Sequence, residues 1–327
     1  MSPSISPYRV HRKRVYPRAH VAAFRLYADA INLQNQTVNA PLQPVFEDVE
    51  TQYNPRKAVP AARIESFMQQ ATARSLAART HLDCRLDIRY GPGALATFDV
   101  FPAAQAGAPL HVFLHGGYWR GRDKFDYSYV ADALTPLGIT TVVMNYDLCP
   151  SVELPAIVQQ VRDGLKWIHA NAAQLGGNPD AFTASGHSAG AHLVACALPK
   201  AGAALQAWVP RAAVLVSGVY DLEPVLSISV NQEIRLRPEQ VDPLSPSRHP
   251  PTPQVPLTVV VGGGETAGFV RQSREFAQAC GAAAQYIELP DFDHYSIMSL
   301  LETPRAPLAR LIDAIARPGK HWSASRR

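Results

Sequence analysis

A serine lies between two glycines in the motif Gly186-His187-Ser188-Ala189-Gly190. The motif follows an apolar run over residues 182–185 and precedes a stretch of small residues that is typical of a tightly packed helix. A strand, a sharp turn and a helix in that order form the context in which a G-x-S-x-G pattern exposes a nucleophilic serine. Glycines two residues before and after it leave room for the adjoining backbone. The pattern predicts Ser188 as a nucleophile, against the alternative that it only caps a helix.

A hydroxyl that attacks a carbonyl creates an oxyanion, which needs two or three fixed N–H donors aimed at one point. A second motif, His115-Gly116-Gly117-Tyr118-Trp119, follows the strand-like run Leu110–Leu114 and contains two glycines that leave backbone N–H groups exposed. We expect His115 to fix this loop by hydrogen bonds rather than to transfer protons. The sequence predicts an oxyanion hole made of the N–H groups of Gly116, Gly117, Tyr118 and Ala189.

A serine hydroxyl is a weak nucleophile until a base takes its proton, and after a G-x-S-x-G turn the partners follow in the order acid, then histidine. Among the histidines beyond Ser188, His192 lies on the helix that the serine begins, and the others are His249, His294 and His321. His249 falls in a proline-rich segment and His321 in a basic tail. His294 follows the last strand-like run, in a loop that can reach back to the serine, and is the predicted general base.

The acid is expected in a loop that follows a strand between the serine and the histidine, where it would hold the imidazole in one tautomer. Two carboxylates meet this condition. Glu265 follows the run Leu257–Val261 and belongs to the penultimate strand, next to the histidine loop, so it is favoured. Asp221 follows Ala213–Val216 and is the alternative acid; otherwise it is a structural hydrogen-bond acceptor. Trp119 and Tyr295 are candidate pocket residues, although an aromatic at a strand end can equally be core.

Short β-branched and aromatic runs alternate with longer helical ones from Leu82 onward, which is the order that produces a mostly parallel sheet with helices on both faces. The fold class is therefore α/β. We expect strands at Arg85–Tyr90, Ala96–Val100, Leu110–Leu114, Thr140–Met144, Phe182–Ser185, Ala213–Val216, Leu257–Val261 and Gln285–Glu288. We expect helices at Lys124–Leu137, Leu154–Gln174, Ala189–Leu198, Ala267–Cys280 and Pro307–Ala316. The proline-dense segment Leu222–Pro256 is expected to be irregular.

Three regions are expected along the 327 residues: a basic N-terminal arm with one helix over 1–56, an α/β domain over 57–316 and a basic tail over 317–327. A second amphipathic segment carries Ile64, Phe67, Met68 and Ala71 on one stripe. The formal charge of +4 comes from the two ends, because the body between Asp29 and Asp313 holds fewer basic than acidic residues. No nucleic-acid groove is therefore expected on the fold.

Composition places the chain among soluble globular proteins, with 47% hydrophobic residues and no apolar stretch long enough to span a bilayer. The N-terminus lacks the apolar core of a secretory signal. Four cysteines without CxxC spacing, Cys84, Cys149, Cys196 and Cys280, suit free thiols in a reducing compartment better than disulfides or a zinc site. We therefore expect a cytoplasmic protein without structural metal, and the sequence leaves homo-oligomerisation open.

Together these motifs resemble the α/β-hydrolase superfamily, in the branch of kynurenine formamidases and hormone-sensitive-lipase-like carboxylesterases. The segments 145–150 (Asn-Tyr-Asp-Leu-Cys-Pro) and Asp293-His294-Tyr295 are similar to other landmarks of that branch, and the likeness spans about Asp83 to Ala316. The resemblance implies a serine hydrolase of small carboxylic esters or aryl formamides, with Ser188, His294 and Glu265 as its triad and with no cofactor or metal. A silent hydrolase fold used for binding, and acyl transfer to an acceptor other than water, remain alternatives. The N-terminal arm looks longer than the family minimum.

Overall fold

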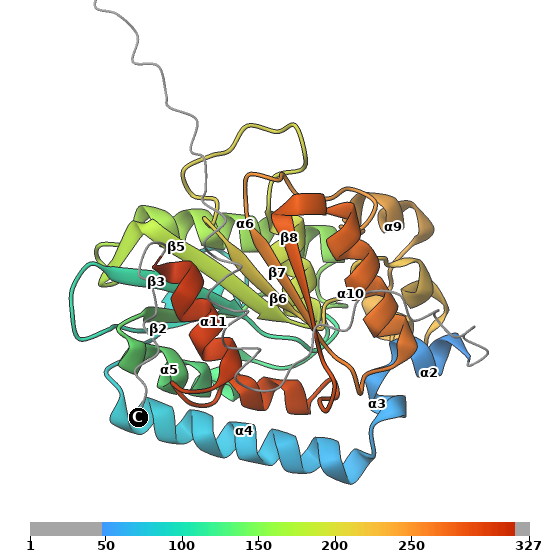
Figure 1. Ribbon diagram of the computed structural model, residues 1–327, viewed down its shortest axis with the longest axis horizontal. Helices are drawn as coiled ribbons and strands as arrows, with labels where there is room; N and C mark the ends of the chain where they lie inside the picture. The colour runs from blue at the N-terminus through green and yellow to red at the C-terminus, as the bar shows by residue number, and fades with distance from the viewer. Residues whose placement is uncertain (1–47, 318–327) are drawn as a thin grey trace, which may run out of the picture.

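An eight-stranded sheet runs through the centre of the protein in the order β1-β2-β4-β3-β5-β6-β7-β8 (Figure 1). The computed structural model describes residues 48–317. β1 and β2 are antiparallel to their neighbours, whereas the other strands are parallel. The strands are β1 (Arg85–Arg89), β2 (Thr97–Phe101), β3 (Ala108–Leu114), β4 (Thr140–Met144), β5 (Gly177–His187), β6 (Ala213–Val216), β7 (Leu257–Gly262) and β8 (Ala284–Leu289). The predicted α/β class and all eight predicted strands are confirmed.

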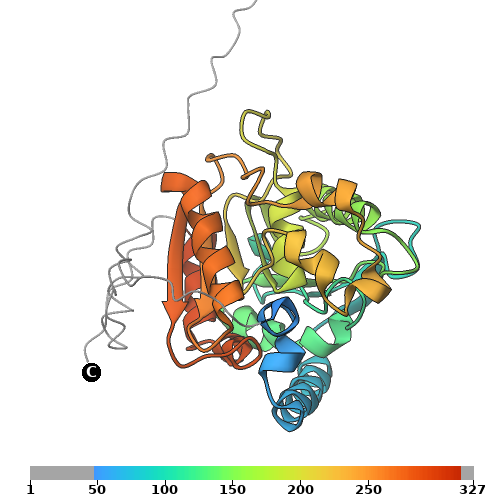
Figure 2. The same cartoon turned by 90° about the vertical axis from the view of Figure 1, so that its right-hand side faces the viewer.

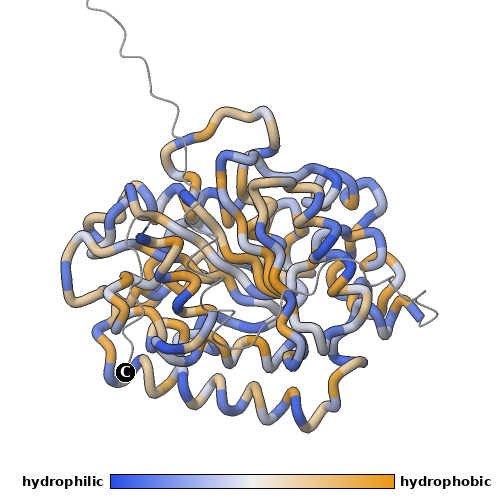
Figure 3. The backbone as a smooth tube through the Cα atoms, viewed as in Figure 1, coloured by the Kyte–Doolittle hydropathy of each residue, from blue (hydrophilic) through white to orange (hydrophobic). Residues whose placement is uncertain are grey.

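Helices cover both faces of this sheet, as Figure 2 shows from the side. α6 (Leu154–Ala170), α7 (Ala189–Ala197) and α10 (Ala267–Ala279) pack into one hydrophobic cluster. α5 (Tyr129–Leu134) and α11 (Pro307–Ala316) pack into a second cluster on the other face. The remaining helices are α2 (Val49–Tyr53), α3 (Pro55–Ala58), α4 (Ala61–His81), α8 (Asn231–Ile234) and α9 (Pro238–Leu244). β6 and β7 are almost entirely apolar and are buried along their length because both of their faces are covered, and the hydrophobic colour gathers near the centre of the molecule in Figure 3.

The helix expected over 124–137 is wrong as a single element. It consists of a 3-10 turn at Lys124–Tyr127, then α5, then a second 3-10 turn at Thr135–Leu137. Pro136 lies at the second break, where it has no N–H to donate to the helix that precedes it. The helix expected over 154–174 ends at Ala170. The proline-dense segment is irregular as predicted, with only the short helices α8 and α9 and one 3-10 turn.

The described part of the N-terminal arm packs against the α/β domain. Gln52 accepts a hydrogen bond from the N–H of Gly268 at the start of α10, and Thr266 donates to the carbonyl of Gln52. Glu50 accepts hydrogen bonds from the N–H and hydroxyl of Ser229. The helix that the sequence predicts in the arm, from the helical spacing of Val21, Phe24, Tyr27 and Ile31, lies outside the described residues, as does the tail beyond 317. The predicted boundaries at 56 and 317 therefore stay predictions. Within residues 48–317, no helix is long and apolar enough to cross a membrane.

Candidate active site

Ser188 stands on a strained turn between β5 and α7. Its backbone has φ 54° and ψ −120°, a region that side-chain-bearing residues rarely occupy. The turn is tight because both flanking glycines meet other backbone atoms. A Cβ on Gly190 would lie 2.1 Å from the carbonyl oxygen of Leu114, and one on Gly186 would lie 2.4 Å from Gly190. Only glycine fits at these two positions, so the local sequence dictates the turn that presents the serine.

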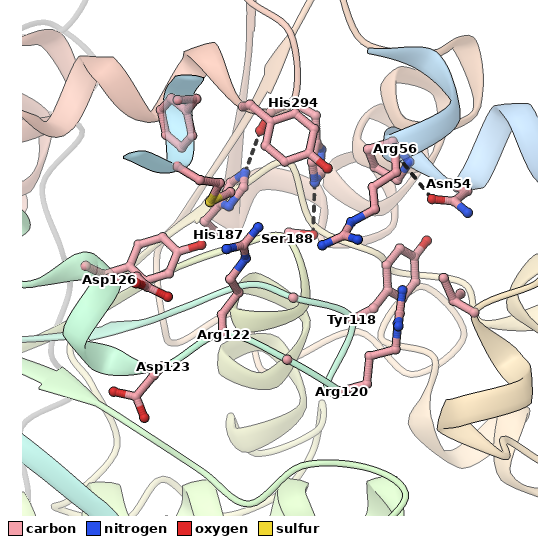
Figure 4. Close-up of a pocket in the computed structure, with 18 residues that line it drawn as sticks. Asn54, Arg56, Tyr118, Arg120, Arg122, Asp123, Asp126, His187, Ser188 and His294 are labelled. Atoms are coloured by element: carbon pink, nitrogen blue, oxygen red, sulfur yellow. Dashed lines mark hydrogen bonds between the residues drawn. The ribbon is translucent and has the colours of Figure 1, made fainter. Parts of the chain in front are cut away.

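A continuous line of hydrogen bonds joins Ser188, His294 and Glu265. His294 Nε2 lies 3.0 Å from Ser188 Oγ, and its Nδ1 lies 2.7 Å from Glu265 Oε2. Figure 4 shows the imidazole pointing directly at the serine. The side chains of His294 and Glu265 are 7% and 1% exposed, so water barely competes for these bonds. The arrangement can take a proton from the hydroxyl and stabilise the resulting imidazolium.

Glu265 is held rigidly because both of its oxygens have partners. Oε2 faces His294, while Oε1 accepts hydrogen bonds from the Gly262 N–H at 2.8 Å and from the Ser217 hydroxyl at 2.5 Å. Ser217 directly follows β6, has φ 51° and donates its N–H to the carbonyl of Val260 on β7, whose carboxyl end leads to Glu265. Ser217 belongs to no motif that the sequence shows. Its position after a strand adjacent to the acid-bearing one was the signal that could have identified it.

The loop that carries His294 is fixed on both sides of the histidine. Asp293 Oδ1 accepts hydrogen bonds from the N–H groups of Tyr295 at 2.9 Å and Ser296 at 2.8 Å. His187 Nε2 donates to the carbonyl oxygen of His294 at 2.8 Å, and the two rings lie 4.9 Å apart. Burial, with the nearby His294, holds the pKa of His187 well below its ordinary value. His187 is therefore a neutral brace for the histidine loop, which sequence reasoning did not identify.

The glycine-rich loop after β3 lies against the serine. A Cβ on Gly116 would come within 3.0 Å of Ser188 Cβ and of the His187 carbonyl oxygen, so this contact requires glycine. His115 braces the loop, with Nδ1 2.7 Å from the Gly116 carbonyl oxygen and Nε2 2.8 Å from Asn145 Oδ1. Within the described part of the chain, four backbone N–H groups near the serine have no hydrogen-bond acceptor: those of Gly116, Gly117, Tyr118 and Ala189. These are the donors that the sequence predicts for the oxyanion hole.

Two of the residues singled out from the sequence lie away from the reacting centre. Asp221, the alternative acid, accepts hydrogen bonds from Arg248 and from the Glu223 N–H. It is therefore a structural hydrogen-bond acceptor, which is the role expected for it if it is not the acid. Trp119 is fully buried with its ring 4.8 Å from that of His192, edge to face, and is absent from the cavity lining. The prediction that Trp119 lines the pocket is therefore wrong, because the loop turns its ring into the core.

A cavity of about 460 Å³ opens beside Ser188 and His294. Its apolar wall is made by side chains from α4, the loop after β3 and the histidine loop: Phe67, Met68, Tyr127 and Tyr295, with Val230 from the proline-dense segment. Three arginines also line it, namely Arg56, Arg120 and Arg122 (Figure 4). Sequence reasoning anticipated Tyr295 here but missed the arginines, because none of them belongs to a recognised motif. Among residues 48–317, no group of three or more His, Cys, Asp or Glu is placed to hold a metal ion.

Comparison with known proteins gives consistent relatives. A family model described as the α/β-hydrolase fold matches residues 111–244. Kynurenine formamidase of Danio rerio is 28% identical over 81% of this chain and 94% of its own length. Kynurenine formamidase of Drosophila melanogaster is 31% identical over 64% of this chain and 74% of its own length. Esterase LipQ of Mycobacterium tuberculosis is 31% identical over 64% of this chain and 56% of its own. Among solved structures, that of a Silicibacter protein with a provisional thioesterase name is similar, with a TM-score of 0.70 and 26% sequence identity. The match covers 81% of this chain and 98% of the Silicibacter chain.

Proposed function

The chain belongs to the α/β-hydrolase family, in the branch of kynurenine formamidases and esterases, and on that premise we propose a serine hydrolase of small carboxylic esters or aryl formamides. The observation that carries the proposal is the hydrogen-bonded line from Ser188 through His294 to Glu265. Such a line activates an otherwise weak nucleophile. The neighbouring cavity is of a size that suits small-molecule substrates.

The proposed reaction passes through an acyl-enzyme. Ser188 Oγ attacks the carbonyl carbon while His294 takes its proton, and Glu265 holds the imidazole and stabilises its positive charge. The tetrahedral intermediate collapses as His294 gives the proton to the leaving alcohol or amine. Water then attacks the acyl-serine with the same base, which releases the carboxylic acid and restores the hydroxyl.

The backbone N–H groups of Gly116, Gly117, Tyr118 and Ala189 are the proposed donors to the oxyanion. Each such donor contributes about 2.7–4 kcal/mol to transition-state stabilisation in enzymes of this type. Because these groups have no other acceptor in the described residues, no hydrogen bond has to break before they act.

We also propose that the substrate is a small molecule rather than a nucleic acid, and that the protein acts in the cytoplasm. The free thiols of Cys84, Cys149, Cys196 and Cys280 support the second point, since no disulfide links them. Analytical ultracentrifugation tests whether the protein forms a homo-oligomer.

The test is replacement of Ser188. We expect Ser188→Ala to lower kcat for 4-nitrophenyl acetate by a factor on the order of 10⁶ and to abolish labelling by a fluorophosphonate. Ser66→Ala, at an exposed position on α4, is the matched control and should retain both. A Ser188→Ala enzyme with the wild-type rate would end the proposal. Comparison of kcat/KM for N-formylkynurenine with those for acetyl and butyryl esters then decides between formamide and ester preference.

A further inference from the structure

Two arginines with no acidic partner line the cavity of the proposed nucleophile. Arg56 comes from α3 and Arg122 from the loop after β3, and both share the cavity with Ser188 and His294. In Figure 4 their guanidinium groups lie on either side of Ser188. Neither forms an ion pair with any carboxylate of residues 48–317. The third arginine, Arg120, is different because it is paired with Glu233.

The acidic residues that line the same cavity are occupied elsewhere. Asp123 accepts hydrogen bonds from the side chain of Asn145 at 2.7 Å and from the Phe125 N–H at 2.8 Å. Asp126 accepts from the hydroxyl of Thr72 at 3.2 Å. Arg56 and Arg122 are therefore left as the two unpaired cations beside the reacting centre in the described part of the chain.

The positive charges of both arginines affect the pKa of Tyr295, an aromatic residue of the cavity wall. Burial raises the pKa of the Tyr295 hydroxyl, and the positive charges of Arg56 and Arg122 oppose that rise. Tyr295 follows His294 directly, so both charges lie near the histidine end of the cavity.

The backbone holds Arg122 next to the glycine-rich loop. Arg122 has φ 76°, a left-handed backbone conformation that is uncommon for residues other than glycine. A Cβ on Gly117 would lie 3.0 Å from Arg122 Cγ, so the arginine stem packs directly over this loop. The guanidinium is thus tied to the same segment that carries the proposed oxyanion donors.

We propose that Arg56 and Arg122 form an anion-binding subsite, which selects esters or formamides that carry a carboxylate besides the bond to be cleaved. This inference rests on the proposed hydrolase function and narrows its substrate class. A guanidinium binds a carboxylate through two parallel N–H bonds, which fixes both position and orientation. The apolar wall, including Phe67 and Tyr127, would hold the hydrocarbon part of such a substrate.

Matched substrate pairs test the subsite on the full-length protein. The first pair places the charge on the acyl side, with 4-nitrophenyl hexanoate against the mono-4-nitrophenyl ester of adipic acid. The second places it on the leaving group, with phenyl acetate against 3-acetoxybenzoate. The readout is the ratio of kcat/KM for the anionic member to kcat/KM for the neutral member. This ratio cancels any general loss of activity or folding.

We expect Arg56→Gln and Arg122→Gln each to lower this ratio by about 10- to 100-fold for one of the two pairs, because each removes a charge-assisted hydrogen bond. The pair that responds identifies the side of the substrate that carries the carboxylate. Lys57→Gln is the matched control, since it removes a charge from the same short helix at an exposed position outside the cavity, and it should leave the ratio unchanged.

A ratio that stays within about twofold of wild type in the double variant Arg56→Gln/Arg122→Gln, for both pairs, overturns the subsite. An equal fall for Lys57→Gln also overturns it, because the effect would then be a long-range field rather than local binding. Failure of the proposed function gives a different result: Ser188→Ala would keep the wild-type rate on the neutral esters.

Discussion

At the scale of single residues, Glu265 determines how the imidazole of His294 is oriented. Its two oxygens bind His294 Nδ1, the Gly262 N–H and the Ser217 hydroxyl, so the carboxylate has almost no freedom to turn. A donor in its place would repel the Nδ1–H proton and favour the wrong tautomer of the imidazole. The same reasoning separates Glu265 from Asp221, whose carboxylate is bound to Arg248.

We expect Glu265→Gln to lower kcat for 4-nitrophenyl acetate by about 10⁴ with little change in KM, by the precedent of amide substitution in other triads. Asp221→Asn is the matched control and should stay within about twofold of wild type, because an exposed ion pair contributes little. Steady-state kinetics on both variants measures this. Equal losses in the two variants would contradict the assignment of Glu265 as the acid.

The turn at Ser188 belongs to the scale of elements, because a strand and a helix must approach each other closely to form it. Gly190 lies against the carboxyl end of β3, and an added Cβ would meet the carbonyl oxygens of Leu114 and His115 at 2.1 and 2.6 Å. Backbone atoms cannot move aside as the end of a flexible side chain can. The start of α7 and the glycine-rich loop would therefore have to separate.

We expect Gly190→Ala to lower the free energy of unfolding by about 1–3 kcal/mol, as overpacking does in dense cores, and to abolish most activity by displacing the loop from the serine. Urea denaturation and ester hydrolysis measure the two effects. Gly91→Ala is the control, since a Cβ there meets only the Cβ of Ala96 at an ordinary 3.5 Å and the position lies outside the cavity lining. Wild-type stability in Gly190→Ala would contradict the close approach.

The long helix α4 is attached to the sheet by buried charges. Asp99 on β2 is fully buried and forms ion pairs with Arg79 on α4 and with Lys124, whose amino group lies 2.8 Å away. Lys124 also pairs with Asp87 at 2.6 Å. Because α4 supplies Phe67 and Met68 to the cavity, this network helps to position the substrate wall.

Asp99→Asn should reduce the free energy of unfolding by about 3–5 kcal/mol, because it takes a carboxylate partner from the buried Lys124 and the largely buried Arg79. Urea denaturation measures the loss. Glu153→Gln, which breaks a solvent-exposed pair with Arg237, is the comparison and should leave the midpoint unchanged. Similar midpoints for the two variants would show that burial does not decide the strength of these pairs.

Buried neutral histidines link the stability of the whole molecule to pH. Burial lowers the pKa of His111 to about 3 and that of His192 to about 4, and it also lowers the pKa of His115 and His187. His111 is satisfied without a charge, between the hydroxyls of Thr183 at 2.9 Å and Ser185 at 2.7 Å. In the unfolded chain these groups bind protons below about pH 6.5, whereas in the folded chain they do not.

The free energy of unfolding should therefore fall as the pH is lowered, because the histidines bind protons in the unfolded state and stay neutral in the folded state. His111 and His192, whose folded pKa values lie below this range, each contribute about 1.4 kcal/mol of loss between about pH 7.5 and pH 5.5, and the lowered pKa values of His115 and His187 act in the same direction. The loss continues down to the folded pKa, about 4 for His192 and about 3 for His111. Urea titrations at both pH values measure it. A free energy of unfolding that does not change over this range would contradict the neutral buried state.

Local patterns were sufficient for much of this protein. Alternating hydrophobic runs determined all eight strands, and the G-x-S-x-G motif placed Ser188 between a strand and a helix. The turn at Ser188 requires glycine two residues before and two residues after the serine, and a requirement over so few residues can be recognised in the sequence. Chain order narrowed the histidines to His294. The catalytic roles themselves remain proposals.

Only the tertiary structure decided which distant groups meet. Strand order puts the end of β7 beside the histidine loop, which brings Glu265 rather than Asp221 to His294. Folding also brings Arg56 and Arg122 into one cavity and turns Trp119 into the core. Such contacts depend on how segments far apart in the chain pack together. No local pattern of residues encodes that packing.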